Sequence, residues 1–159
     1  MVLIKGSTAH VEAVAKIYEE AKKGEFCVWN EFYPTAEHAR QDAEWGGLYL
    51  LTDGDAIVGC ASVEKIPEDN DLPFWRVTDD THREIARIAI APEYRGRGYA
   101  KLMVGLLLDE LRAQGARSVH LLAAPENPPA VRTYESLGFD RMGECHRYGH
   151  GYIAFEKIL

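Results

Sequence analysis

The sequence predicts a mixed α/β (α+β) fold, a sheet of about seven strands with helices on both faces. Segments with strand-like and helix-like patterns follow one another in the order βααβββαβαββ. Because strands come before, between and after the helices, one mixed sheet has to accommodate them all. The chain of 159 residues has the size of one domain and can bury a substantial core. Residues 1–159 are therefore predicted to form a single domain.

Short apolar runs and capping residues define the elements of the first half. Ser7 or Thr8 is a suitable N-cap for a helix that ends before Gly24, and Thr35 is one for a second helix. The turn Asp53-Gly54-Asp55 separates two apolar runs and indicates a hairpin. The predicted elements are strands over residues 2–5, 48–52 and 56–66 and helices over residues 8–23 and 36–45.

The second half alternates strands and helices. Its longer helix is apolar nearly all round, so we expect this helix to be deeply buried. Residues 67–80 form an acidic excursion in which Phe74 and Trp75 pack back on the protein or line a site. The predicted elements are strands over residues 83–90, 118–124, 140–148 and 152–159, the last two joined at 149–151, and helices over residues 98–114 and 128–137.

Composition and charge limit the range of possible functions. The chain is 47% apolar and 27% charged, as expected of an ordinary globular protein. Its net charge of −7 argues against nucleic-acid binding, because an acidic surface repels a phosphate backbone. A cationic or amine-bearing substrate suits this balance better.

Cysteine usage and hydropathy indicate a cytoplasmic protein. Cys27, Cys60 and Cys145 are odd in number and show no CxxC spacing, which argues against a disulfide framework and a zinc site. The histidines show no metal-ligand spacing either, so no metal is expected. The sequence shows no signal-peptide pattern and no window of roughly 18 apolar residues, so no membrane partner is expected.

The stretch IAIAPEYRGRGYAKL, residues 88–102, joins an apolar strand to an apolar helix through two arginines and two glycines. The first turn of a helix leaves N–H groups without intrahelical partners, and the helix dipole adds positive charge there. Glycines let an anion approach the backbone closely. A plain turn with solvated arginines is the alternative. The agreement of strand, arginines, glycines and helix in order and spacing favours a phosphate site.

Two motifs resemble the GNAT superfamily of N-acetyltransferases. RGRGYA, residues 95–100, matches the family's acetyl-CoA-binding pattern of Arg or Gln, two residues, Gly, one residue and Gly or Ala. ENPPAVRTYESLGF, residues 126–139, resembles its second half-site. The resemblance covers about the second half of the chain, and WNEFYP and GGLYLL resemble bacterial members of unassigned substrate. It implies a largely antiparallel sheet that is splayed between strands 4 and 5.

The resemblance also assigns roles by position. Backbone groups of Ile88, Ala89 and Ile90 would face the pantetheine arm and the acetyl carbonyl. Asn127 would hydrogen-bond the pantetheine, and Tyr134 would lie near the sulfur. The residues of the implied acetyl-CoA site are Ile88, Ala89, Ile90, Arg95, Gly96, Arg97, Gly98, Tyr99, Ala100, Lys101, Asn127, Ala130 and Tyr134.

Acetyl transfer to an amine needs a base and a proton donor. An alkylamine with a pKa of about 10.4 is protonated at neutral pH and attacks only after it loses a proton. The resemblance favours Glu84 as this base; a solvated strand-end carboxylate is the alternative, and His82 is a second candidate in a polar loop. Tyr134 is the predicted general acid, with a half-buried packing residue as its alternative. The backbone of Ile90 is a candidate donor to the thioester oxygen.

Aromatic and acidic residues are candidates for the acceptor site. Trp29, Tyr33 and Trp75 are predicted to contact the acceptor, with Phe32 and Phe74 in the same patch, because aromatic rings stack on substrates or hold cations. Ordinary packing is the alternative for each of them. The acidic residues that would attract a basic acceptor, or are merely solvated, are Glu25, Glu31, Glu68, Asp69 and Asp71.

These residues predict an acetyl-CoA-dependent N-acetyltransferase that moves the acetyl group to a primary amine of a small molecule by direct attack in a ternary complex. Two alternatives stay open: a protein N-terminal or lysine acetyltransferase, and a non-catalytic acyl-CoA-binding sensor, which would need neither Tyr134 nor Glu84. A nucleotide-binding enzyme is disfavoured, because the loop lacks GKS or GKT. The resemblance leaves a homodimer open.

Overall fold

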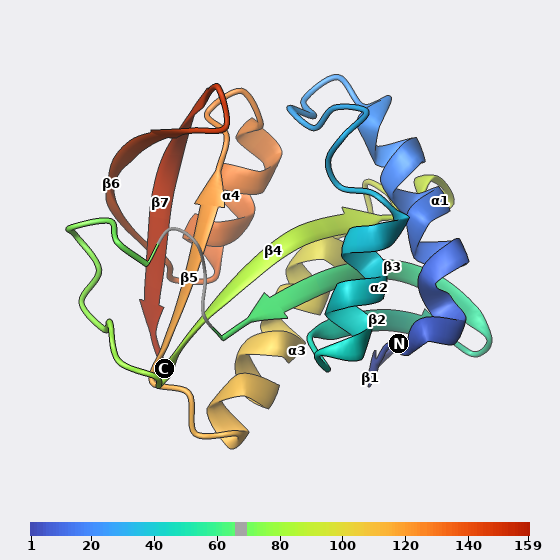
Figure 1. Ribbon diagram of the computed structural model, residues 1–159, viewed down its shortest axis with the longest axis horizontal. Helices are drawn as coiled ribbons and strands as arrows, with labels where there is room; N and C mark the ends of the chain where they lie inside the picture. Colours follow the sequence, from blue (N-terminus) through green and yellow to red (C-terminus); the bar gives the residue numbers. More distant parts are fainter. Residues whose placement is uncertain (66–69) are drawn as a thin grey trace.

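The computed structural model describes residues 1–65 and 70–159 (Figure 1). Within these residues, seven strands form one sheet in the order β1-β2-β3-β4-β5-β7-β6. The strands are β1 (Val2–Lys5), β2 (Leu48–Asp53), β3 (Ala56–Glu64), β4 (His82–Ile90), β5 (Ser118–Ala123), β6 (Asp140–Arg147) and β7 (His150–Ile158). The helices are α1 (Val11–Lys22), α2 (Ala36–Glu44), α3 (Tyr99–Ala113) and α4 (Pro128–Ser136), with the short 3-10 turns η1 (Thr8–His10) and η2 (Pro92–Tyr94). The predicted order βααβββαβαββ is confirmed.

The described strands are antiparallel to their neighbours except where β4 meets β5. That parallel pairing is confined to the beginning of both strands, where residues 82–84 lie beside residues 118–120. Beyond this short contact the two strands diverge (Figure 1). The predicted splay between the fourth and fifth strands is confirmed.

Local chemistry fixes the start of two helices. Thr35 precedes α2 with an extended backbone, and its hydroxyl and N–H both contact Nδ1 of His38. Asn127 caps α4, because its Oδ1 accepts a hydrogen bond from the N–H of Ala130 at 3.2 Å. Pro128 follows at the first helical position, where its missing N–H costs nothing. The cap at Thr35 lies where the sequence predicts it, whereas the cap at Asn127 was not predicted.

The helices cover opposite faces of the sheet (Figure 1). α3 and α4 pack on one face around the larger apolar core, which includes Leu107. α1 and α2 cover the other face with a second core around Tyr18. A third cluster on β7 joins Ala154 to Leu72 and Trp75 of the described part of the excursion. Because residues 153 and 155 belong to the first core, Ala154 faces the side of α1 and α2.

Three predictions about these elements are wrong. α3 is not buried all round: Leu102 is 40% exposed, because the helix lies on one face of the sheet and turns its outer side to solvent. The last hairpin turns at Tyr148-Gly149 and not at residues 149–151, since both turn residues adopt the positive φ of a two-residue turn. His82 is the buried first residue of β4 and does not lie in a polar loop.

The predicted excursion is described only in part. β3 ends at Glu64, and the end of the predicted strand at Ile66, together with Pro67, Glu68 and Asp69, lies outside the described residues. Residues 70–80 are described, and they pack back on the sheet through Trp75. A search of the described helices finds none with the length and apolar character needed to cross a membrane.

Candidate active site

The divergence of β4 and β5 exposes one edge of β4. The N–H of Ala91, directly after β4, donates to the carbonyl of Val58 in β3 at 2.9 Å. Successive N–H groups along a strand point to opposite sides, so those of Ile88 and Ile90 are directed away from β3, towards β5. Because the β4–β5 pairing stops at Glu84, these groups meet no strand there.

Two cavities share this opening. The first, of about 330 Å³, extends towards α4 and is called the α4 cavity. The second, of about 560 Å³, extends towards α2 and is called the α2 cavity. Residues 85–87 of β4, Trp29 and Tyr152 line both. The two cavities therefore meet at the middle of β4, where molecules bound in each would touch.

The α4 cavity brings together much of the implied acetyl-CoA site: Ile88, Ala89, Ile90, Arg95, Asn127, Ala130 and Tyr134. Gly96 to Lys101 continue from Arg95 around the start of α3 and do not line this cavity. Gly96 and Gly98 have φ angles of 73° and 79°, which other residues adopt only with strain. The first helical bond of α3 runs from Leu102 to Gly98, so the N–H groups of residues 99–101 have no intrahelical acceptor.

Tyr134 forms a wall of the α4 cavity. Its ring packs edge-on against Phe139 and Phe155, with centroid distances of 6.0 and 5.9 Å. Burial raises the pKa of Tyr134 to about 12, so the phenol stays protonated at neutral pH. A thiol has a pKa of about 8.5, so complete proton transfer from this phenol to a thiolate is uphill. Hydrogen-bond donation to sulfur is the role that the raised pKa favours.

Glu84 lies at the point where the strands separate. It is the last residue of β4 paired with β5, opposite His120, and on its other side it pairs with Glu64 of β3. Glu84 lines the α2 cavity, whereas Tyr134 lines the α4 cavity. The two predicted catalytic residues are thus placed on opposite sides of one opening.

Arg87 forms the polar floor of the α2 cavity. Its side chain is 8% exposed, and it reaches Asp42 from α2 with Nη2 and Nε at 2.7 and 3.0 Å. Nη2 also lies 2.5 Å from Glu64, Nε donates to Ser62, and Nη1 donates to the hydroxyl of Tyr33 at 3.1 Å. One guanidinium therefore ties α2, β3, β4 and the segment before α2 together.

The backbone at Arg87 is unusual as well. Its φ of 51° is in the left-handed region, at the point where the register between β3 and β4 shifts. Burial by itself would lower the pKa of Arg87, but the surrounding oxygens, with those of Tyr33 and Asp42 foremost, outweigh burial and raise it. The guanidinium therefore stays charged beside the opening.

The predicted acceptor aromatics separate into two groups. Trp29 lines both cavities and packs edge-on against Tyr18 at 5.9 Å, and Tyr33 lines the α2 cavity. Trp75 lines neither cavity: it is buried, and its ring stacks on that of His120 at 4.0 Å. The packing alternative therefore describes Trp75.

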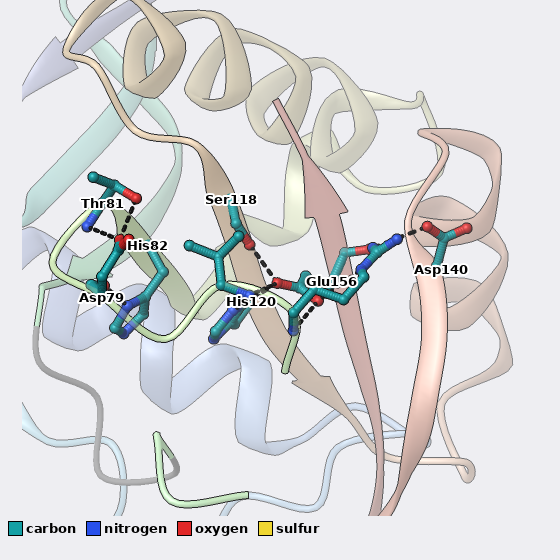
Figure 2. Close-up of polar contacts among 9 residues, drawn as sticks. Asp79, Thr81, His82, Ser118, His120, Asp140 and Glu156 are labelled. Atoms are coloured by element: carbon teal, nitrogen blue, oxygen red, sulfur yellow. Dashed lines mark hydrogen bonds and ion pairs between the residues drawn. The ribbon is translucent and has the colours of Figure 1, made fainter. Parts of the chain in front are cut away.

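A buried polar cluster supports the sheet beside the opening (Figure 2). The carboxylate of Glu156 accepts from the hydroxyl of Ser118 at 2.8 Å and lies 3.1 Å from Nε2 of His120. It also accepts the backbone N–H groups of Arg76 and Val77 at 2.9 and 3.1 Å. Burial by itself would raise the pKa of Glu156, but hydrogen bonds from the backbone N–H and the guanidinium of Arg76, from Ser118 and from Val77 outweigh burial and lower it to about 2. The cluster joins β5 and β7 to the end of the excursion.

Several residues that line the opening were not identified as site residues from the sequence. Asp42, Glu64 and Tyr152 carry no local signal, since each lies in a segment whose pattern also suits an exposed side chain. Arg87 does carry a local signal, because an arginine inside the apolar run IARIAI needs a buried partner. Among residues 1–65 and 70–159, no three His, Cys, Asp or Glu side chains are grouped to hold a metal ion.

Two solved structures share this architecture. An acetyltransferase of the GNAT family from Streptococcus agalactiae 2603 superposes with a TM-score of 0.85 at 18% identity, over 99% of this chain and 95% of that one. A putative acetyltransferase from Salmonella typhimurium, solved with its cofactor acetyl-CoA, superposes with a TM-score of 0.75 at 16% identity, over 99% and 93%. Identities this low show a shared fold.

The sequence profile of the Acetyltransferase (GNAT) family matches residues 12–139, so the chain belongs to this family. A mycothiol acetyltransferase from Corynebacterium glutamicum (strain R) is 35% identical over 120 residues, 74% of this chain and 35% of that protein. N-alpha-acetyltransferase 30 from Schizosaccharomyces pombe is 40% identical over 100 residues, 57% of this chain and 67% of that protein. The chain thus spans about a third of the length of the mycothiol enzyme.

Members of this family use acetyl-CoA, and the residues around the α4 cavity fit such a group. The first-turn N–H groups of α3, with Arg95 and Arg97 beside them, suit phosphates. The open edge of β4 offers backbone partners to an amide-bearing arm. Asn127 uses its Oδ1 to cap α4, so its amide N–H groups are not consumed by the cap.

Proposed function

We propose that this chain transfers an acetyl group from acetyl-CoA to a primary amine of a small molecule, by direct attack in a ternary complex. The observation that carries the proposal is the meeting of two cavities at residues 85–87 of β4. One side offers donors for an acyl-CoA and the other offers carboxylates for an amine. Holding both reactants in contact removes much of the entropic cost of their encounter. The α2 cavity, about 560 Å³, has the volume of a small-molecule site.

Bound acetyl-CoA supplies an acetyl thioester. The N–H of Ile90 donates to the thioester oxygen as negative charge develops there. Glu84 accepts the proton of the ammonium group, directly or through a water, so that the neutral nitrogen attacks. As the carbon–nitrogen bond forms and the carbon–sulfur bond breaks, the nitrogen loses a second proton, which reaches the leaving thiolate directly or through a water, while the hydroxyl of Tyr134 donates a hydrogen bond to that sulfur.

A peptide amino terminus is a second candidate acceptor. The likeness to N-alpha-acetyltransferase 30 supports it. An α-amine has a pKa of about 7.7–8.0, so a larger share is already neutral at physiological pH and the reaction depends less on a base. Dependence on Glu84 therefore separates the two acceptors chemically.

The proposal is tested by thiol release from acetyl-CoA across amines, polyamines, amino acids, aminoglycosides and short peptides. Turnover with small amines supports it, and turnover with peptides alone selects the second candidate. If acetyl-CoA binds and raises the melting temperature by mass action but no acceptor causes thiol release, the chain is a sensor and the proposal is wrong.

Variants of the two catalytic candidates sharpen this test. Tyr134→Phe removes one hydroxyl and is expected to lower kcat by about 10²–10⁴ while acetyl-CoA still binds. Tyr49→Phe is the matched control, because Tyr49 of β2 lines neither cavity and lies outside the stretch of residues 88–102. Glu84→Gln is expected to lose more activity at pH 6.5 than at pH 9, where more of the amine is already neutral. A pH profile equal to that of the unaltered protein would remove Glu84 as the base.

A further inference from the structure

The α2 cavity has an excess of negative charge. The charged groups among its described lining are the carboxylates of Asp42, Glu64 and Glu84 and the guanidinium of Arg87. Three carboxylates against one guanidinium leave a formal charge of −2 while the histidines are neutral. Such a surface favours a cationic ligand and repels an anionic one.

The single guanidinium is already engaged by the protein. Arg87 contacts Asp42, Glu64, Ser62 and Tyr33, and its side chain is 8% exposed. An anionic acceptor group would have to displace these contacts to reach the guanidinium. The carboxylate of Glu64 is more accessible, with a side chain 25% exposed. Glu64 engages Arg87 through Oε1 and still has the more exposed side chain of the pair, so a ligand in the cavity reaches the carboxylate more easily than the guanidinium.

Aromatic side chains surround these carboxylates. Trp45 after α2 and Tyr148 in the β6–β7 turn are 75% and 66% exposed, although such large rings are usually buried. Both line the α2 cavity, as do Tyr33 and Tyr152. The Tyr33 ring already has the Arg87 guanidinium 5.9 Å from its centroid. Aromatic faces beside carboxylates suit an alkyl chain that carries a cationic end group.

We infer that the acceptor carries a second positive charge besides the amine that is acetylated, as diamines and polyamines do, and that Glu64 selects for it. This inference rests on the proposed function, because it assigns the α2 cavity to the acceptor. Glu84 then serves the reacting amine, while Glu64, paired with it across β3 and β4, faces the second cation. The aromatic residues of the cavity contact the alkyl segment that joins the two amines of the acceptor.

The first test compares three acceptors of equal chain length: 1,5-diaminopentane, 5-aminopentan-1-ol and 5-aminopentanoate. We expect kcat/KM for the diamine to exceed that for the neutral alcohol by about tenfold, the effect of one partly exposed charge pair, and the acid to be poorest. Raising the salt from about 0.02 to 0.5 M should reduce the preference, because salt screens the attraction. Equal values for diamine and alcohol would overturn the inference.

Glu64→Gln removes one carboxylate and keeps the shape. We expect it to reduce the preference for the diamine by about three- to tenfold. Glu12→Gln is the matched control: Glu12 is an exposed carboxylate on α1 that does not line the cavity. A preference unchanged in Glu64→Gln would overturn the role of Glu64. The salt series on the unaltered protein tests the charge even if the variant does not fold.

A binding measurement separates this inference from the proposed function. Titration calorimetry with CoA present measures the affinity for 1,5-diaminopentane and for 5-aminopentan-1-ol without turnover. A diamine that binds tighter but is never acetylated supports the cation site and refutes the proposed catalysis. Acetylation of the alcohol and the diamine at equal rates and equal affinities supports the catalysis and refutes the cation site.

Discussion

The two sides of the β4–β5 opening are built differently. On the α4 side the groups that suit an acyl-CoA are chiefly backbone groups within residues 85–101, from the open edge of β4 to the first turn of α3, and α4 adds the side chains of Asn127 and Tyr134. The α2 side consists of side chains from α2, β3, β4 and the β6–β7 turn, held by the guanidinium of Arg87. The donor side depends chiefly on local chain geometry, with two side chains from α4 added, whereas the acceptor side depends on contacts between distant segments.

The contrast has an energetic consequence. Backbone groups at a helix start face water without large penalty, so changes on the α4 side should affect ligand binding more than folding. A buried charge that loses its partner costs much more, so changes on the α2 side should affect folding first. Substitutions on both sides test this difference, and the largest effect is expected on the α2 side.

Arg87→Met should be the most damaging substitution. It leaves Asp42, which is 4% exposed, without its cationic partner, and the expected loss is about 3–5 kcal/mol in the free energy of unfolding. Arg97→Met on the α4 side removes an exposed arginine and should change stability by less than about 0.5 kcal/mol while weakening acetyl-CoA binding. Urea denaturation of both variants measures the difference.

A double-mutant cycle checks the cause. Asp42→Asn should restore part of the stability lost in Arg87→Met, because it removes the unpaired charge. If Arg87→Met alone costs less than about 1 kcal/mol, or if Asp42→Asn restores nothing, the guanidinium does not hold the α2 side together. The α2 side would then not depend on this buried ion pair for its stability.

The Glu156 cluster should give the next largest effect. Its pKa falls from 4.5 to about 2 on folding, so the unfolded chain binds more protons than the folded one between these values. The stabilisation is complete above about pH 4.5 and is lost as the pH falls towards 2. It amounts to at most about 3 kcal/mol.

Urea denaturation between pH 5 and pH 3 measures this loss. Glu156→Gln should be less stable at pH 6 by about 2 kcal/mol and should lack much of the acid dependence. Glu37→Gln, an exposed carboxylate of α2, should keep the slope of the unaltered protein. Equal slopes in all three proteins would mean that Glu156 is not a source of acid sensitivity.

The same contrast explains what the sequence could predict. The order of elements and the cap at Thr35 depend on periodicity and local motifs, the splay is implied by the resemblance to the GNAT superfamily, and the structure confirms all three. The α2 side needs Asp42 and Arg87 in contact, 45 positions apart. No local pattern encodes that pairing. Trp75 shows the same limit, because only the fold brings its ring onto His120.

Gly98→Ala tests the α4 side by its backbone. Gly98 has a φ of 79°, and alanine there should cost about 1–2 kcal/mol and shift the first-turn N–H groups, weakening acetyl-CoA binding. Gly105→Ala, within α3, is the control, and the change that it causes in the free energy of unfolding should have the opposite sign. A Cβ there lies 4.0 Å from Leu137, so alanine should stabilise α3 by about 0.5–1 kcal/mol. Equal effects at both glycines would show that the left-handed turn has no special role.

Asn127 should give the smallest effect on stability and the clearest separation of folding from binding. Asn127→Ala removes the cap of α4 and should cost about 1 kcal/mol. Asn127→Asp keeps an acceptor for the N–H of Ala130 and suits the helix dipole, so stability should change by less than about 0.5 kcal/mol. It replaces the amide N–H groups by a negative oxygen, so acetyl-CoA affinity should fall about tenfold. If Asn127→Asp binds acetyl-CoA as tightly as the unaltered protein does, Asn127 acts only as a cap. Acetyl-CoA binding on the α4 side would then depend on backbone groups without the side chain of Asn127.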